Sequence, residues 1–62
     1  MLSDVDREIV KNMYECDLSV KEVAKRMNYS KGAIYNHLSE IYRKTGLDPK
    51  KVRGIVELRK LI

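Results

Sequence analysis

Residues 19–46 read SVKEVAKRMNYSKGAIYNHLSEIYRKTG, and this stretch predicts two helices that meet at a tight corner. Ser19, followed three residues later by Glu22, forms a capping box, which is typical of a helix N-terminus. We therefore expect the first helix to run over Val20–Met27. Ala24 is its smallest inward-facing side chain, and a small residue there lets a second helix cross closely.

The second helix of the pair begins directly after the corner. Asn28 tolerates the left-handed backbone conformation that ends helices, and Ser30 is a suitable N-cap for the next helix. That helix is expected over Lys31–Thr45, and Gly46 ends it. The sequence thus places only three residues between the two helices.

The two helices divide into apolar and polar faces. The expected core residues are Val23, Ala24, Met27, Ile34, Leu38 and Ile41. The outer face of the second helix carries Lys31, Gly32, Tyr35, Asn36, Ser39 and Arg43. Such a mixture of amide, phenol, hydroxyl and cations can bind base edges and phosphates in a DNA major groove. An ordinary solvated helix face is the alternative interpretation.

A preceding helix is predicted from Ser3 to about Glu15. Ser3 and Asp6 form an acidic variant of the capping box. Four-residue spacing of apolar side chains predicts a helix face that packs across the following pair, made by Val5, Ile9, Val10 and Met13. Tyr14 is expected at the edge of this core, and Leu18 is expected to pack just before the next helix.

A fourth helix is predicted from about Pro49 to Leu61, with Asp48 as its N-cap and Pro49 at its first position. No alternating β-pattern occurs, so the expected fold is all-α: one domain over residues 1–62, with a trihelical core and a fourth helix. At 62 residues the chain is near the lower size at which a hydrophobic core stabilises a fold without disulfides or a structural metal.

Charge is unevenly distributed along the chain. Residues 1–18 hold two cations and five acids, a net charge of −3, whereas residues 19–62 hold eleven cations and four acids, a net charge of +7. A basic half that contains the helical pair indicates a phosphate-backbone partner. A solvated lysine-rich surface would give the same bare charge.

Several classes of protein are disfavoured by the composition. The chain has one cysteine, Cys16, and one histidine, His37, so neither a disulfide framework nor a zinc site is expected. No paired carboxylates, nucleophile with a base, or glycine-rich phosphate loop can be assembled, so we expect no enzyme and no cofactor. Apolar runs are short, which excludes a membrane-spanning helix and predicts a cytoplasmic protein. No small-molecule ligand is evident from the sequence.

The chain resembles the DNA-binding domain of the LuxR and GerE family of bacterial transcription regulators. The resemblance spans LSDVDREIV, SVKEVAKRM, SKGAIYNHL, IYRKTGL and DPKKVRGIVEL, which is nearly the whole chain. The segment TGLD is also similar to the C-terminal helix-turn-helix of PucR-type regulators. Both resemblances imply a helix-turn-helix protein that binds double-stranded DNA, with the third helix in the major groove and, in the first family, a fourth helix that forms the dimer.

The resemblance also implies roles for individual residues. The base contacts would be made by Tyr35, Asn36 and Ser39, and the phosphate contacts by Ser19, Lys21, Lys31 and Arg43. Asn36 fits independently, because an amide can bond an adenine edge in bidentate fashion. Tyr35 either packs on a sugar or thymine methyl or covers the helix surface. His37 lies at an inward-facing position, where we expect a structural histidine.

The fourth helix is expected to form a homodimer. Its apolar residues cover an arc wider than one core contact requires, and the predicted interface is Val52, Ile55, Val56 and Arg59. A frayed terminus at Leu61 and Ile62 is the alternative. The leading hypothesis is a dimeric, sequence-specific DNA-binding regulator. The rival is a protein-interaction module that uses the same helical core to bind a regulator or a polymerase subunit.

Overall fold

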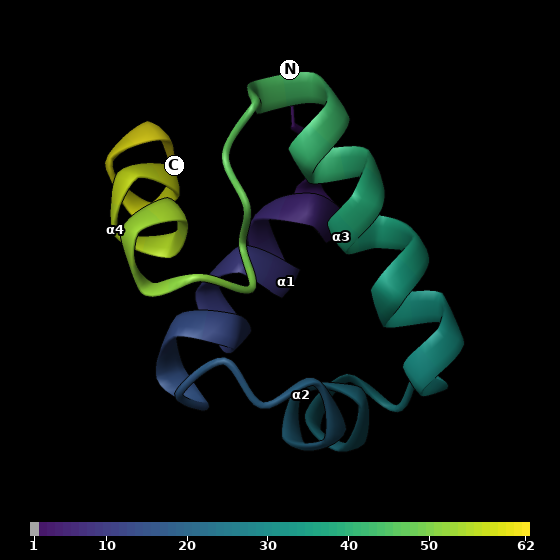
Figure 1. Ribbon diagram of the computed structural model, residues 1–62. Coiled ribbons are helices and arrows are strands. Elements are labelled where there is room, and N and C mark those ends of the chain that lie inside the picture. Colours follow the sequence, from purple (N-terminus) through teal and green to yellow (C-terminus); the bar gives the residue numbers. More distant parts are fainter. Residues whose placement is uncertain (1) are drawn as a thin grey trace.

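The computed structural model describes residues 2–62, which form four helices: α1 (Asp4–Glu15), α2 (Val20–Met27), α3 (Lys31–Thr45) and α4 (Val52–Leu61). No strand occurs within residues 2–62, and the all-α prediction is confirmed. Helix α1 packs against the other three helices, and α2 and α3 also pack on each other. Figure 1 shows α3 and α4 on opposite sides of α1, so the two helices with functional predictions are separated by α1.

Helix α1 begins at the predicted capping box. The Ser3 hydroxyl accepts a hydrogen bond from the Asp6 backbone N–H (3.1 Å), and the Asp6 carboxylate accepts one from the Ser3 N–H (3.3 Å). The prediction that Val5 lies in the core is wrong: Val5 is 36% exposed, whereas Asp6 is 2% exposed. The inward face is Asp6, Ile9, Val10 and Met13, so a carboxylate occupies the first place of the apolar stripe.

A tight backbone reversal connects α1 to α2. Asp17 (φ 52°) and Leu18 (φ 66°) are both in the left-handed region, and the Leu18 N–H donates to the Met13 carbonyl at 2.8 Å. This hydrogen bond satisfies a carbonyl at the end of α1. Leu18 packs against the core, as expected, and the reversal brings α2 across the end of α1.

The corner between α2 and α3 confirms the prediction at each residue that defines it. Asn28 is left-handed (φ 58°), and the Tyr29 N–H donates to the Ala24 carbonyl at 2.9 Å. The Ser30 hydroxyl then accepts from the Ala33 N–H at 3.1 Å and caps α3. Gly46 ends α3 with φ 73°.

The core gathers apolar side chains from all four helices. Its buried members are Ile9, Val10, Met13, Val23, Ala24, Ile34, Leu38, Ile41, Ile55 and Leu58. Met27, predicted in this set, is only partly buried and packs against it, as do Cys16 and Leu47. Helix α3 therefore turns one face inward and leaves the opposite face in solvent.

Helix α4 begins three residues later than predicted. Asp48 and Pro49 start a turn instead: the Asp48 carboxylate accepts from the Lys50 N–H (2.9 Å), and the Asp48 carbonyl accepts from the Lys51 N–H (3.1 Å). Lys51 is the N-cap, without a side-chain capping bond. The Asp-Pro pair suits the first two positions of a β-turn as well as a helix start, which explains the error. Gly54 packs against this turn.

Candidate nucleic-acid interface

The outer face of α3 is open to solvent along its length. Tyr35 is 48% exposed, Asn36 and Ser39 lie outside the core, and the Arg43 side chain is 72% exposed. Because α3 buries Ile34, Leu38 and Ile41 on the other side, these polar residues project away from the core. The structure thus brings all three predicted base-contacting residues onto one accessible face.

The polar groups on this face are available to a partner. Within residues 2–62, the side chains of Tyr35, Asn36 and Ser39 make no hydrogen bond, whereas Arg43 forms an ion pair with Glu40 one turn earlier. An unpaired amide and hydroxyl on a rigid helix can bind base edges without breaking an intramolecular bond. Glu40 was not singled out by the sequence reasoning, although its i, i+3 spacing to Arg43 was visible.

Two of the predicted phosphate contacts, Lys21 and Lys31, lie beside the corner, whereas Arg43 lies in the last turn of α3. A hollow of about 400 Å³ between α2 and the start of α3 has no acidic residue in its lining, which is Lys21, Ala24, Lys25, Asn28, Tyr29 and Lys31. Three lysines in one hollow concentrate positive charge next to the N-terminus of α3, where backbone N–H groups also favour an anion. Lys25 was missed by sequence reasoning. Its signal was the four-residue spacing from Lys21, which puts both on one helix face.

Ser19, the fourth predicted phosphate contact, has a structural role. Its hydroxyl accepts a hydrogen bond from the Glu22 N–H at 3.3 Å and caps α2. The hydroxyl proton is not used by this capping bond. Ser19 can therefore cap the helix and donate to a phosphate oxygen at the same time.

A buried carboxylate ties α3 to α1. Asp6 lies 3.3 Å from His37 Nδ1 and 3.1 Å from Lys44 Nζ, and its side chain is only 3% exposed. Burial raises the pKa of Asp6, but hydrogen bonds from Lys44, Ser3 and His37 together outweigh it, and the pKa lies below the ordinary 3.8. The ionised carboxylate accepts from both α3 side chains, so the cluster fixes how α3 is presented.

His37 is a structural histidine in this cluster, as expected. Its ring also stacks on Tyr29 from the corner, with 6.1 Å between ring centroids and 27° between planes. The Asp6 cluster itself was missed by sequence reasoning. Its partners are 31 and 38 residues away along the chain, too distant for a local pattern to reveal.

The predicted dimer residues on α4 do not share one environment. Val52 is 69% exposed and Val56 is 40% exposed, but Ile55 is 2% exposed and belongs to the core. The inclusion of Ile55 in an outward interface is therefore wrong, because that side chain already packs inside the chain. The Arg59 guanidinium lies 4.1 Å from the centre of the ring of Tyr14, a residue that is 45% exposed.

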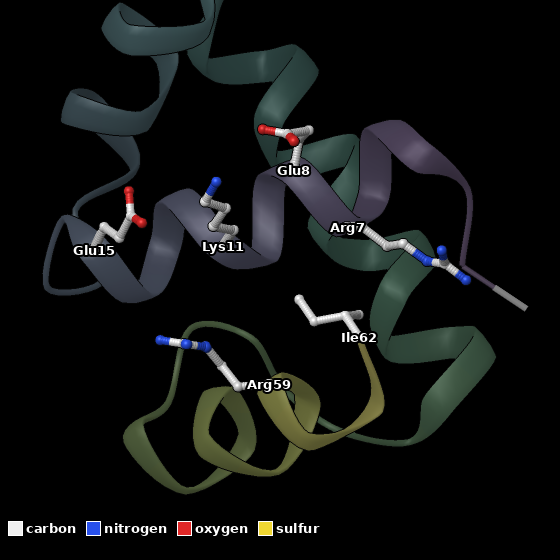
Figure 2. Close-up of a pocket in the computed structure, with 6 residues that line it drawn as sticks. All are labelled: Arg7, Glu8, Lys11, Glu15, Arg59 and Ile62. Carbon is white, nitrogen blue, oxygen red and sulfur yellow. The ribbon is translucent and has the colours of Figure 1, made fainter.

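A second hollow lies between α1 and α4, away from the α3 face. Figure 2 labels its lining: Arg7, Glu8, Lys11 and Glu15 on α1, with Arg59 and Ile62 at the end of the chain on the other side. Its volume is about 330 Å³. Cations and carboxylates are interleaved along its walls, so it does not concentrate charge of one sign as the lysine hollow does.

Neither a metal cluster nor a membrane span occurs in the part of the chain that the structure describes. Among residues 2–62, no three His, Cys, Asp or Glu side chains are grouped so that they could hold a metal ion. Over the same residues, no helix has the length and apolar character needed to cross a membrane.

A short α2, a three-residue corner and an α3 with an exposed polar face together define a fold of the helix-turn-helix DNA-binding type. Comparison with protein families agrees. The sequence model of a family described as a helix-turn-helix domain matches residues 1–40, which include α1, α2 and most of α3. The chain belongs to this helix-turn-helix family. Comparisons with curated proteins and with solved structures gave no match.

Proposed function

We propose that this protein is a non-enzymatic, sequence-specific transcription regulator that inserts α3 into the DNA major groove. The observation that carries the proposal is the exposed, unpaired stripe of Tyr35, Asn36 and Ser39 on a helix whose other face is buried. Tyr35, Asn36 and Ser39 would contact bases. The sequence resemblance to LuxR, GerE and PucR-type regulators supports a role in transcription.

Phosphate contacts would hold α3 in register. The lysine hollow is next to the start of α3, and Lys21, Lys25 and Lys31 around it can neutralise the backbone that flanks the groove. Ser19 can donate a further hydrogen bond. Such contacts supply affinity for any duplex, whereas the α3 stripe supplies the preference for one sequence.

Two substitutions on α3 separate these roles. Asn36→Ala is expected to cost about 1 to 3 kcal/mol on the selected site and little on random duplex. Lys31→Ala is expected to weaken both equally and to reduce the salt dependence of binding by roughly one unit. Fluorescence anisotropy over a salt series measures both effects. Equal losses for Asn36→Ala on the two duplexes would remove it from the base contacts.

We place a weak dimer contact on α4. Val52 and Val56 are exposed on one side of the helix. Leu61 (63%) is also exposed, but it lies about 140° around the helix from Val56, and Ile62 (43%) follows it at the chain end. The same helix of a second copy can cover this surface across a two-fold axis. One short helix per subunit makes a small interface, so two half-sites about one DNA turn apart would help to assemble it.

The dimer is tested with Val56→Glu on α4 and a matched control, Val5→Glu on α1, which makes the same chemical change at another exposed valine. Val56→Glu is expected to lose affinity for a duplex with two half-sites while its affinity for a single half-site is unchanged. Val5→Glu should alter neither. A wild-type protein that binds two half-sites no more tightly than one, and sediments as a monomer, contradicts the dimer.

A protein-interaction module is the second candidate, favoured by the same exposed apolar surface of α4. The two functions differ in their response to salt. DNA binding must weaken steeply as salt rises because counterions are released, whereas an apolar protein contact need not. Binding to random duplex that is absent, or insensitive to salt, would favour the protein-interaction module.

A further inference from the structure

The only acidic residue of α3 lies on the face proposed to enter the groove. At about 100° per residue, Glu40 is about 40° around the helix from Asn36 and about 60° from Arg43. Its side chain is 44% exposed and forms an ion pair with Arg43. A carboxylate at this position is repelled by phosphates, so its presence needs an explanation.

Stability does not explain it. Both side chains of the Glu40–Arg43 pair are exposed, Arg43 by 72% and Glu40 by 44%. Exposed ion pairs contribute little to the free energy of folding. Glu40 lies near the middle of α3, outside the first and last turns where charge interacts with the helix dipole. Within residues 2–62, the Glu40 carboxylate has no hydrogen bond to the core. Its one structural effect is on Arg43.

We propose that Glu40 is a positioning residue that holds Arg43 as a reader of guanine. This inference rests on the proposed DNA-binding function. An unrestrained arginine beside a groove is attracted to the nearest phosphate. A guanidinium that is already paired with a carboxylate is attracted to phosphate less strongly, because the carboxylate offsets its charge. Its remaining N–H groups can then donate to guanine O6 and N7. Arg43 is thereby assigned to a base edge, in place of the phosphate contact that the family resemblance implies.

The pair also restrains binding to other sequences. The Glu40 carboxylate keeps repelling the backbone wherever Arg43 does not meet a guanine, so the affinity for random duplex falls more than the affinity for the correct site. Specificity is a difference between these two affinities. Glu40 is therefore expected to raise discrimination while lowering overall affinity.

Glu40→Gln tests the proposal, because it removes the charge and keeps the shape. Glu57→Gln is the matched control: Glu57 forms the same kind of i, i+3 pair, with Lys60 on α4, and its substitution changes the net charge equally. Arg43→Lys keeps the cation but lacks the planar fork. Each variant is used to select bound sequences from a random duplex pool and is then titrated on a single half-site, where α4 contacts do not contribute. Circular dichroism checks that each is folded.

The wild type is expected to prefer guanine at one position by about 5- to 150-fold, the range for a bidentate arginine contact. Glu40→Gln and Arg43→Lys should both lose this preference at the same position. Glu40→Gln should also bind random duplex more tightly, with a salt dependence steeper by about one unit, because Arg43 then reaches a phosphate. Glu57→Gln should retain the wild-type sequence preference.

Other outcomes overturn the proposal. Unchanged discrimination in Glu40→Gln would show that Glu40 does not position Arg43. An equal change in Glu57→Gln would show that only net charge matters. A cytosine preference lost in Glu40→Gln but kept in Arg43→Lys would mean that Glu40 itself contacts the base. A wild type without salt-dependent duplex binding would overturn the DNA-binding function itself, which is a separate result.

Discussion

The Asp6 cluster provides a sharp test of how α3 is held. Asp6→Asn keeps the size and planar shape of the side chain but removes its charge. The Asp6 carboxylate is 3% exposed, and its oxygens lie 3.1 Å from Lys44 Nζ and 3.3 Å from His37 Nδ1. With asparagine, both interactions lose the negative charge of the carboxylate, and one carboxylate oxygen is replaced by an N–H₂ group that cannot accept a hydrogen bond.

The expected loss follows from these contacts. A hydrogen bond to a charged group contributes about 1.5 to 3 kcal/mol when buried. Lys44 is 37% exposed, so solvent screens its share of the interaction. The remaining amide oxygen can still accept from the Ser3 N–H. We therefore expect Asp6→Asn to lower the free energy of unfolding by about 1 to 2 kcal/mol, against about 3 to 5 kcal/mol in total for a chain this small.

The pH dependence gives a second signature. Because the pKa of Asp6 in the fold lies below its ordinary 3.8, the carboxylate adds stability above that value, and this is lost as pH falls through the lower value of the folded state. Urea denaturation of wild type and Asp6→Asn is measured at pH 7 and then stepwise into acid. The difference between the two unfolding free energies should shrink below the ordinary pKa.

Lys44→Met separates the ion pair from the rest of the cluster, since it keeps the apolar stem. The double variant Asp6→Asn/Lys44→Met should lose less stability than the sum of the two single losses. A loss in Asp6→Asn that does not change with pH, or single losses that add fully, would refute a stabilising role for the Asp6 charge.

Three further substitutions test the packing. Gly54→Ala places a Cβ 2.0 Å from the Asp48 carbonyl oxygen, so the turn before α4 must move; we expect a loss of about 2 to 3 kcal/mol in urea denaturation, and an unchanged midpoint would contradict this contact. Ala24→Leu overfills a site that is 5% exposed and should cost about 1 to 3 kcal/mol in thermal unfolding; full retention of stability would show spare room between α2 and α3. In Gly32→Ala the added Cβ meets only Ser30 Oγ, at 4.0 Å, so the substitution should stabilise α3 by about 0.5 to 1 kcal/mol. Because Gly32 lies on the outer face of α3, the added methyl group should weaken duplex binding; a stabler variant with unchanged affinity would place the DNA on another face.

The helix ends were determined locally. Ser19, Ser30 and Gly46 each act on backbone groups no more than four residues away, and the structure has α2 and α3 at the predicted bounds. Caps are short-range interactions, so neighbouring residues suffice to predict them. The buried and exposed faces of α3 followed from its 3.6-residue period for the same reason.

Tertiary contacts decided the features that the sequence left open. Asp6 is inward and Val5 outward because His37 and Lys44, 31 and 38 residues away, supply partners that make a buried carboxylate tolerable. The pair Asp48-Pro49 permits either a turn or a helix start, and close packing of Gly54 on Asp48 accompanies the turn. Ile55 is in the core because α4 lies against α1. Local sequence determines where helices begin and end, but the partner across the core determines which face of a helix is buried, and those partners are distant in sequence.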